Sequence, residues 1–125
     1  VIATRHSRSG MFYTDKGRLR ITDKRYRNDM YPPDTSCNCY TCTRFTRAYL
    51  HHLFRVGEIL AASLTTIHNL TWFASFMARM RASIVDGTFE SYRQWVHEIY
   101  PEKDETPPRS PPPKHTAKRP KKRRK

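Results

Sequence analysis

Three cysteines lie within six positions of one another, in the segment Cys37-Asn38-Cys39-Tyr40-Thr41-Cys42, and the 125-residue chain has no other cysteine. An odd number of cysteines spaced this closely cannot pair off into disulfides, and a bridge between Cys37 and Cys39 would be strained. Thiolates are ligands that zinc favours, and a structural zinc site needs four nitrogen or sulfur donors. The spacing therefore predicts a zinc site. The alternative is three inert, buried thiols in a tight loop.

Three histidines that follow the cysteines are candidates for the fourth ligand. His51 and His52 are adjacent in a short predicted helix, so at least one of them must point away from the metal. His68 lies in an apolar stretch, where a lone histidine is more often a core residue than a ligand. Because three thiolates require a further partner, we favour His68.

The elements that must position these ligands can be read from the hydrophobic pattern. Met11–Thr14 and Arg18–Ile21 flank Asp15-Lys16-Gly17, which predicts a β-hairpin with the glycine in its turn. The segment Tyr31-Pro32-Pro33-Asp34 breaks regular structure and leads into the cysteines. The cysteines should therefore lie in a loop between the hairpin and the first long helix.

Helical periodicity begins after Cys42 and predicts three helices. Gly57 should end the first helix, Asp86-Gly87 the second and Pro101 the third, which starts near Thr88. We expect each helix to bury one apolar stripe. The expected inward residues are Phe45, Tyr49, Leu53 and Val56, then Leu60, Leu64, Ile67, Leu70, Phe73, Met77, Met80 and Ile84, and finally Phe89, Tyr92, Val96 and Ile99.

The formal charge of +13 is distributed unevenly along the chain. Residues 1–99 carry 14 Lys/Arg and 8 Asp/Glu, whereas residues 109–125 carry nine basic residues and no acidic one. Both parts suit a polyanion such as RNA. Six prolines between positions 107 and 120, and a nearly continuous run of charge after them, predict that residues 100–125 form a disordered basic tail. This tail could hold phosphates, act as an address signal or simply be solvated.

The length allows one small domain and excludes a two-domain enzyme. Because residues 1–4 read like a strand from the middle of a domain, we expect the chain to be a piece of something longer. No stretch approaches 18 uninterrupted apolar residues, and we see no leader, so we expect a soluble protein with no membrane partner. Clustered, reduced thiols favour a cytoplasmic location.

The cysteine spacing, with His68 following after 25 residues, resembles the zinc motif of tRNA-guanine transglycosylases (queuine tRNA-ribosyltransferases). Four further segments fit the same family, and the similarity covers roughly residues 1–98. They are Cys39-Tyr40-Thr41-Cys42, Arg47-Ala48-Tyr49-Leu50-His51-His52-Leu53-Phe54, Gly57-Glu58-Ile59-Leu60 and Thr66-Ile67-His68-Asn69-Leu70. The resemblance implies that His68 is the fourth ligand of one structural zinc ion.

The first ten residues also resemble a family segment, V-x-P-T-R-N-A-R-N-G, which forms a loop that recognises the tRNA anticodon around the wobble base. Thr4, Arg5, Arg8 and Gly10 agree with it, whereas Ala3, His6, Ser7 and Ser9 depart from it. The resemblance implies an RNA-binding segment over Thr4, Arg5, His6, Ser7 and Arg8. Its two guanidinium groups would supply most of the donors for bases and phosphates.

The family exchanges guanine at the wobble position of tRNA for a 7-deazaguanine base in queuosine biosynthesis, through an aspartate nucleophile and a covalent RNA–enzyme intermediate. That aspartate aligns two positions before Val1, and the second catalytic aspartate lies farther upstream, so we expect this chain alone to be inactive. Asp15, Asp23, Asp29 and Asp34 read as turn and surface residues and offer no replacement.

The fold that this resemblance implies is an α+β fragment, namely the C-terminal part of a (β/α)8 TIM-barrel enzyme. Residues 1–30 would form the end of the barrel, the anticodon-recognition loop and the hairpin. Residues 31–99 would form a zinc-clasped helical subdomain, and residues 100–125 the tail. The intact family enzyme would pair as a homodimer. The alternatives are a stand-alone, zinc-stabilised RNA-binding module and a truncated, inactive remnant.

Overall fold

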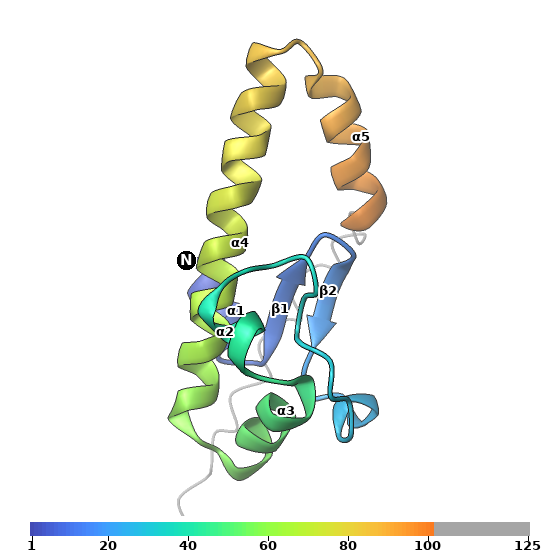
Figure 1. The fold of residues 1–125 in the computed structure, drawn as a ribbon. Helices are drawn as coiled ribbons and strands as arrows, with labels where there is room; N and C mark the ends of the chain where they lie inside the picture. The colour runs from blue at the N-terminus through green and yellow to red at the C-terminus, as the bar shows by residue number, and fades with distance from the viewer. Residues whose placement is uncertain (102–125) are drawn as a thin grey trace, which may run out of the picture.

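In the computed structural model, which describes residues 1–101, one long helix spans the molecule and the other elements pack along it (Figure 1). This helix, α4, covers Ile59–Val85. α5, Phe89–Ile99, folds back beside its C-terminal half. The elements that precede α4 are α1 (Ile2–Ser7), β1 (Met11–Thr14), β2 (Gly17–Arg20), the 3-10 helix η1 (Lys24–Tyr26), α2 (Tyr40–Arg44) and α3 (Arg47–Val56). The described residues therefore form a small α+β unit.

The predicted hairpin is confirmed, with a shift in its turn. β1 pairs with β2 in antiparallel register, Phe12 opposite Leu19 and Thr14 opposite Gly17, so the loop consists of Asp15 and Lys16. Gly17 therefore belongs to β2 and not to the turn, and its φ of 107° is one that residues with a Cβ rarely adopt.

The strand-like interpretation of residues 1–4 is wrong, because they begin helix α1. β-branched residues favour strands, but this preference is weaker than tertiary packing. α1 packs against α4, and two hydroxyls close its turns: Thr4 Oγ1 donates to the Val1 carbonyl and Ser7 Oγ to the Ala3 carbonyl. The packing against α4 thus decides the local structure.

The hydrophobic core lies where the hairpin, α3 and the first half of α4 meet. Phe12, Ile21 and Leu50 are completely buried there. α3 begins after Thr46, whose hydroxyl accepts from the Tyr49 N–H, and ends at Gly57, whose φ is 78°. The predicted end at Gly57 is confirmed. The predicted stripe is only partly right, because Leu53 is buried whereas Tyr49 and Val56 are exposed.

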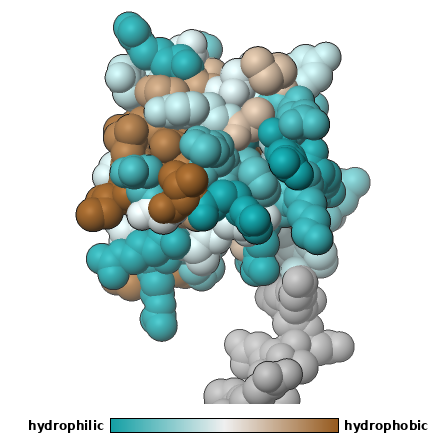
Figure 2. Space-filling model, turned by 90° about the horizontal axis from the view of Figure 1, so that it is seen from below, coloured by the Kyte–Doolittle hydropathy of each residue, from teal (hydrophilic) through white to brown (hydrophobic). Residues whose placement is uncertain are grey.

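The predicted inward face of α4 is largely wrong. Its buried positions are shared by small, polar and aromatic residues, namely Ala61, Leu64, Thr65, His68, Asn69, Trp72 and Ser83. Leu60, Ile67, Leu70, Met77 and Ile84 are exposed instead. Polar residues occupy the inward face because they bond to the hairpin and to α1. Seen from below, the surface divides into an apolar area, coloured brown, and a hydrophilic area, coloured teal (Figure 2).

α4 ends at Val85, and Gly87 follows with a φ of 70°, as the Asp86-Gly87 signal predicts. The third predicted helix is confirmed as α5, but none of its residues is fully buried. The TIM-barrel part of the expectation stays a prediction. The tail predicted over residues 100–125 lies outside the described residues from position 102 onward. Within residues 1–101, no helix has the length and hydropathy that crossing a membrane would require.

Candidate metal centre

The three cysteines surround the start of α2. Cys39 is the N-cap of this helix, and its sulfur accepts a hydrogen bond from the Cys42 N–H at 3.4 Å. The short helix is fixed to α4 by Thr41, whose buried hydroxyl donates to the Leu64 carbonyl at 2.7 Å. A residue at the N-cap and one three positions later lie on the same side of a helix start, so the sulfurs of Cys39 and Cys42 face the same point.

His68 reaches this point from the middle of α4. Its Nδ1 lies 3.6 Å from the Cys39 sulfur and 3.2 Å from the Cys42 sulfur. The ligand atoms of Cys37, Cys39, Cys42 and His68 all lie within 4.8 Å of one another. Cys39, Cys42 and His68 are buried, and Cys37 is half-buried. The structure therefore brings together the four residues that the spacing singled out.

The imidazole of His68 is held in the form that can bind a metal. Its Nε2 lies 2.8 Å from the Tyr13 carbonyl oxygen, and a carbonyl can only accept, so Nε2 carries the proton. The Nδ1 lone pair is then directed at the sulfurs. A histidine ligand commonly donates its other N–H to a carbonyl in this way, which fixes both tautomer and orientation. This contact favours a metal site over a simple core histidine.

Burial favours the uncharged forms of Cys37, Cys42 and His68 as long as no metal ion is bound. Burial raises the pKa of the Cys37 and Cys42 thiols, and the side chain of Cys39 adds to this effect at both. Burial lowers the pKa of His68, which keeps its ring neutral. A bound metal ion would reverse the preference of the sulfurs, because coordinating thiols are deprotonated outright. The soft sulfur donors and the neutral imidazole fit zinc by their chemistry.

The edge of β1 that faces away from β2 is bonded to His68 and to its neighbour Asn69. Ile21 N–H donates to the Gly10 carbonyl, so along β1 the residues Met11 and Tyr13 point their backbone groups away from β2. Asn69 satisfies these groups: its Oδ1 accepts from the Tyr13 N–H at 3.1 Å, and its Nδ2 donates to the Met11 carbonyl at 2.9 Å. His68 Nε2 donates to the remaining group of this edge, the Tyr13 carbonyl. Sequence reasoning missed Asn69. The only signal for its role was a polar residue directly after the candidate ligand His68.

The two other candidate histidines lie elsewhere. His51 is buried in α3 and donates from Nδ1 to the Ile21 carbonyl at 2.8 Å, whereas His52 is exposed. Neither belongs to the group of potential ligands. The choice of His68 over this pair therefore agrees with the structure.

The segment predicted to contact RNA lies in α1 and its C-cap residue, which expose some of its side chains and bury others. Thr4, Arg5 and Arg8 are exposed, and His6 is half-buried, with its ring stacked against Tyr13. Ser7 is completely buried and accepts a hydrogen bond from Asn69 Nδ2 at 3.0 Å. Ser7 thus faces the protein in this arrangement, and the exposed donors are the guanidinium groups of Arg5 and Arg8.

Three of the aspartates interpreted as turn and surface residues have specific partners. Asp15 accepts from both terminal nitrogens of Arg79, at 2.9 and 2.8 Å, and from the Trp72 indole at 2.9 Å. Asp29 pairs with Arg47 at 3.0 Å. Asp34 is buried and accepts from the Ser36 N–H at 2.9 Å. These carboxylates thus link or brace separate parts of the fold, which goes beyond their interpretation as turn and surface residues.

Comparison with known proteins points to one family. The model of the family "Queuine tRNA-ribosyltransferase" matches residues 1–102. The chain is 51% identical over 92 residues to the queuine tRNA-ribosyltransferase of Nitrosomonas europaea, covering 74% of this chain and 25% of that protein. It is 50% identical over 96 residues to the protein of that name from Dechloromonas aromatica, covering 77% and 25%, respectively. For that of Thioalkalivibrio sulfidiphilus, the identity is 44% over 111 residues, covering 89% and 29%.

The chain thus spans about a quarter of the length of the curated relatives it matches. The match extends through the hairpin, the four clustered ligand residues and the long helix that carries His68. On this evidence, the chain belongs to the queuine tRNA-ribosyltransferase family.

Proposed function

We propose that this chain is the C-terminal part of a tRNA-guanine transglycosylase, which exchanges guanine at the wobble position of tRNA for a 7-deazaguanine base. The observation that carries the proposal is the cluster of three cysteines and one histidine, in a chain that matches the family model. The catalytic aspartates would be supplied by the part of the enzyme that precedes these residues. The chain itself contributes a zinc site and contacts to tRNA.

Cys37, Cys39, Cys42 and His68 would hold one zinc ion, whose chemistry is structural. Three thiolates and one imidazole complete a tetrahedral coordination sphere and leave no position for a reacting water. The residues tie the loop that starts α2 to the middle of α4, and His68 continues the link to β1. Such sites contribute on the order of 10 kcal/mol or more of binding free energy, which is comparable with the whole stability of a domain.

The tRNA contacts are assigned to the exposed side of α1. Arg5 and Arg8 provide planar groups with several donors, which suit phosphates and base edges, and Thr4 adds a hydroxyl beside them. The half-buried His6 lies next to them, and the buried Ser7 supports the helix from inside. The anticodon loop would lie across this surface, and two copies of the intact enzyme would form a homodimer.

A chimeric enzyme tests the proposal. Residues 1–101 replace the matching segment of the Nitrosomonas europaea relative, and incorporation of labelled guanine into tRNA is measured. We expect exchange by the chimera, none by the 125-residue chain alone, and loss of exchange with Cys39→Ser. A control chimera with Leu70→Ala, a change at an exposed position of α4, should keep its activity. A folded, zinc-loaded chimera without exchange would contradict the proposal.

A further inference from the structure

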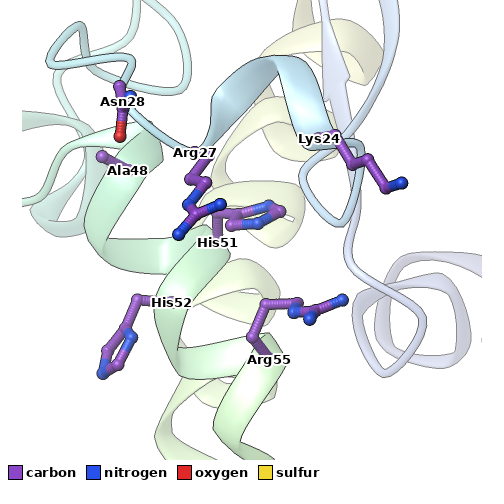
Figure 3. A pocket seen from close by; sticks show the side chains of 7 residues that line it. All are labelled: Lys24, Arg27, Asn28, Ala48, His51, His52 and Arg55. Atoms are coloured by element: carbon purple, nitrogen blue, oxygen red, sulfur yellow. The ribbon is translucent and has the colours of Figure 1, made fainter.

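A cleft between η1 and α3 is distinct from the metal centre and from α1. Its volume is about 640 Å³, which is within the range of ligand pockets. It is lined by Lys24, Arg27, Asn28, Ala48, His51, His52 and Arg55. Figure 3 shows these side chains, with Lys24, Arg27 and Asn28 on the η1 side and the others on α3. Six of the seven lining side chains are charged or polar, whereas most small-molecule sites are lined mainly by apolar side chains.

The positive charge of this cleft is not compensated within residues 1–101. Lys24, Arg27 and Arg55 form no ion pair there, and no carboxylate is among the lining residues. Among the basic residues outside the cleft, Arg47 is paired with Asp29 and Arg79 with Asp15, whereas Lys16 and Arg81 also form no ion pair within residues 1–101. Cations gathered without a counter-charge repel one another, so their arrangement favours an anion between them.

The neighbouring groups keep the cleft in shape. His51 is fixed at its base by the hydrogen bond from Nδ1 to the Ile21 carbonyl. Arg25, which lies between two lining residues in sequence, is held away by its ion pair with Asp23 and by the face of the Tyr26 ring, 4.8 Å from its guanidinium carbon. The remaining cations of η1 and α3 are therefore those that line the cleft.

The chemistry of the lining indicates the kind of anion. Guanidinium groups form strong, forked hydrogen bonds with phosphate oxygens. No Phe, Tyr or Trp is among the lining residues, and the buried His51 is held by its bond to the Ile21 carbonyl, so the lining offers mainly charge for contacts with RNA. Contacts of this type position a nucleic acid without reading its sequence.

We propose that the cleft between η1 and α3 binds a backbone phosphate of the RNA partner, as a second contact separate from α1. The inference rests on the proposed function in one respect, which is that the partner is RNA. Arg27 lines the cleft from the η1 side and Arg55 from α3, and Lys24 adds a third charge. The contact anchors the RNA backbone and leaves recognition of the anticodon to α1.

The test measures binding of a fluorescein-labelled RNA hairpin to the full, zinc-loaded chain by anisotropy, between about 50 and 200 mM KCl. The pocket variant is Arg27→Gln with Arg55→Gln. The control variant, Lys16→Gln with Arg81→Gln, removes the same charge at exposed positions that form no ion pair within residues 1–101. The tail is present in every protein, so its contribution cancels in the comparison.

We expect the pocket variant to lose about three- to tenfold in affinity at the lower salt concentration. The slope of log Kobs against log salt should decrease by about 1, because each lost phosphate contact removes roughly 0.7–0.9. The control should lose less than half of either effect. Equal affinities and slopes for the two variants would overturn the phosphate site, and so would a wild-type chain that binds no RNA.

Two further measurements separate the possible outcomes. Titration with inorganic phosphate, followed by the NMR signals of His51 and His52, tests for a small anion: saturation by phosphate with no loss of RNA binding in the pocket variant would overturn the RNA assignment. Guanine exchange by the chimera tests the proposed function independently. If the pocket variant behaves like the control while the chimera is active, only the phosphate site in the cleft is refuted. If the chimera is inactive while RNA binding by the chain is normal, only the enzymatic assignment is refuted.

Discussion

Replacing Asn69 by alanine removes the side chain that satisfies the outer edge of β1. Asn69 is completely buried in α4 and bonds to the Tyr13 N–H, the Met11 carbonyl, the Ala3 carbonyl and the Ser7 hydroxyl. The Ala3 carbonyl retains the bond from Ser7 Oγ, so the backbone groups that lose their partner are those of Tyr13 and Met11. The cost of the substitution follows from these two groups.

A buried polar group left without a partner costs about 1–3 kcal/mol. Tyr13 is buried, whereas Met11 is half-buried and its carbonyl can be reached by water, so its share is smaller. We therefore expect Asn69→Ala to lower the free energy of unfolding by about 2–4 kcal/mol. The neighbouring Leu70 is exposed, so Leu70→Ala should change it by less than about 0.5 kcal/mol.

The assay is urea unfolding of the zinc-loaded chain, followed by far-UV circular dichroism at a fixed free zinc concentration, because metal binding contributes to apparent stability. A loss of less than about 0.5 kcal/mol for Asn69→Ala, equal to that of the Leu70 control, would refute the argument that this side chain carries the strand edge. Equal metal content in both variants shows that the effect does not arise at the ligands.

Cys39→Ser, or removal of zinc by a chelator, should collapse the helical signal in circular dichroism, because Cys39 caps α2 and is one of the four proposed zinc ligands. An unchanged spectrum after verified metal loss would rule this out. Arg79 lowers the pKa of Asp15, so the contribution of this pair is complete above the ordinary carboxyl pKa and is lost only as the pH falls through the lowered value. A double-mutant cycle with Asp15→Asn and Arg79→Gln should therefore give the same coupling free energy at pH 6 and pH 8. This energy should be at most about 1 kcal/mol, because both side chains are more than a third exposed. A coupling energy that differs between the two pH values would contradict the assignment. Gly10→Ala should destabilise the protein by about 2–3 kcal/mol and Gly57→Ala by about 1 kcal/mol. Both glycines have a positive φ, but of the two only a Cβ at Gly10 would meet another side chain, with Ile21 Cγ2 at 3.0 Å. Equal unfolding midpoints for the two variants would oppose this.

The parts of the molecule that depend on local chemistry could be predicted from the sequence. The cysteine spacing specifies a cluster, because three thiols within six positions have few other arrangements. The glycines after α3 and α4 mark the helix ends through their backbone freedom. His68 followed from the need for a fourth donor. The hairpin followed from its turn residues, although its glycine lies in β2.

The inward face of α4 could not be predicted from hydrophobic periodicity. That argument counts apolar residues, but this helix turns His68 and Asn69 inward, where they bond to the backbone of β1, and leaves Ile67 and Leu70 outside. The partners of Asp15 and Asn69 lie 56 or more positions away in sequence. Contacts at that separation have no local signature. The same limit explains why residues 1–4 read like a strand although they begin α1, which packs against α4.

X-ray absorption at the zinc edge, combined with metal analysis of the freshly purified chain, tests the central claim most directly. The account predicts one zinc ion per chain, with three sulfur neighbours at about 2.3 Å and one nitrogen at about 2.0–2.1 Å, and the nitrogen should disappear from the spectrum of His68→Cys while a fourth sulfur replaces it. A chain without stoichiometric metal, or a first shell dominated by oxygen, would contradict it.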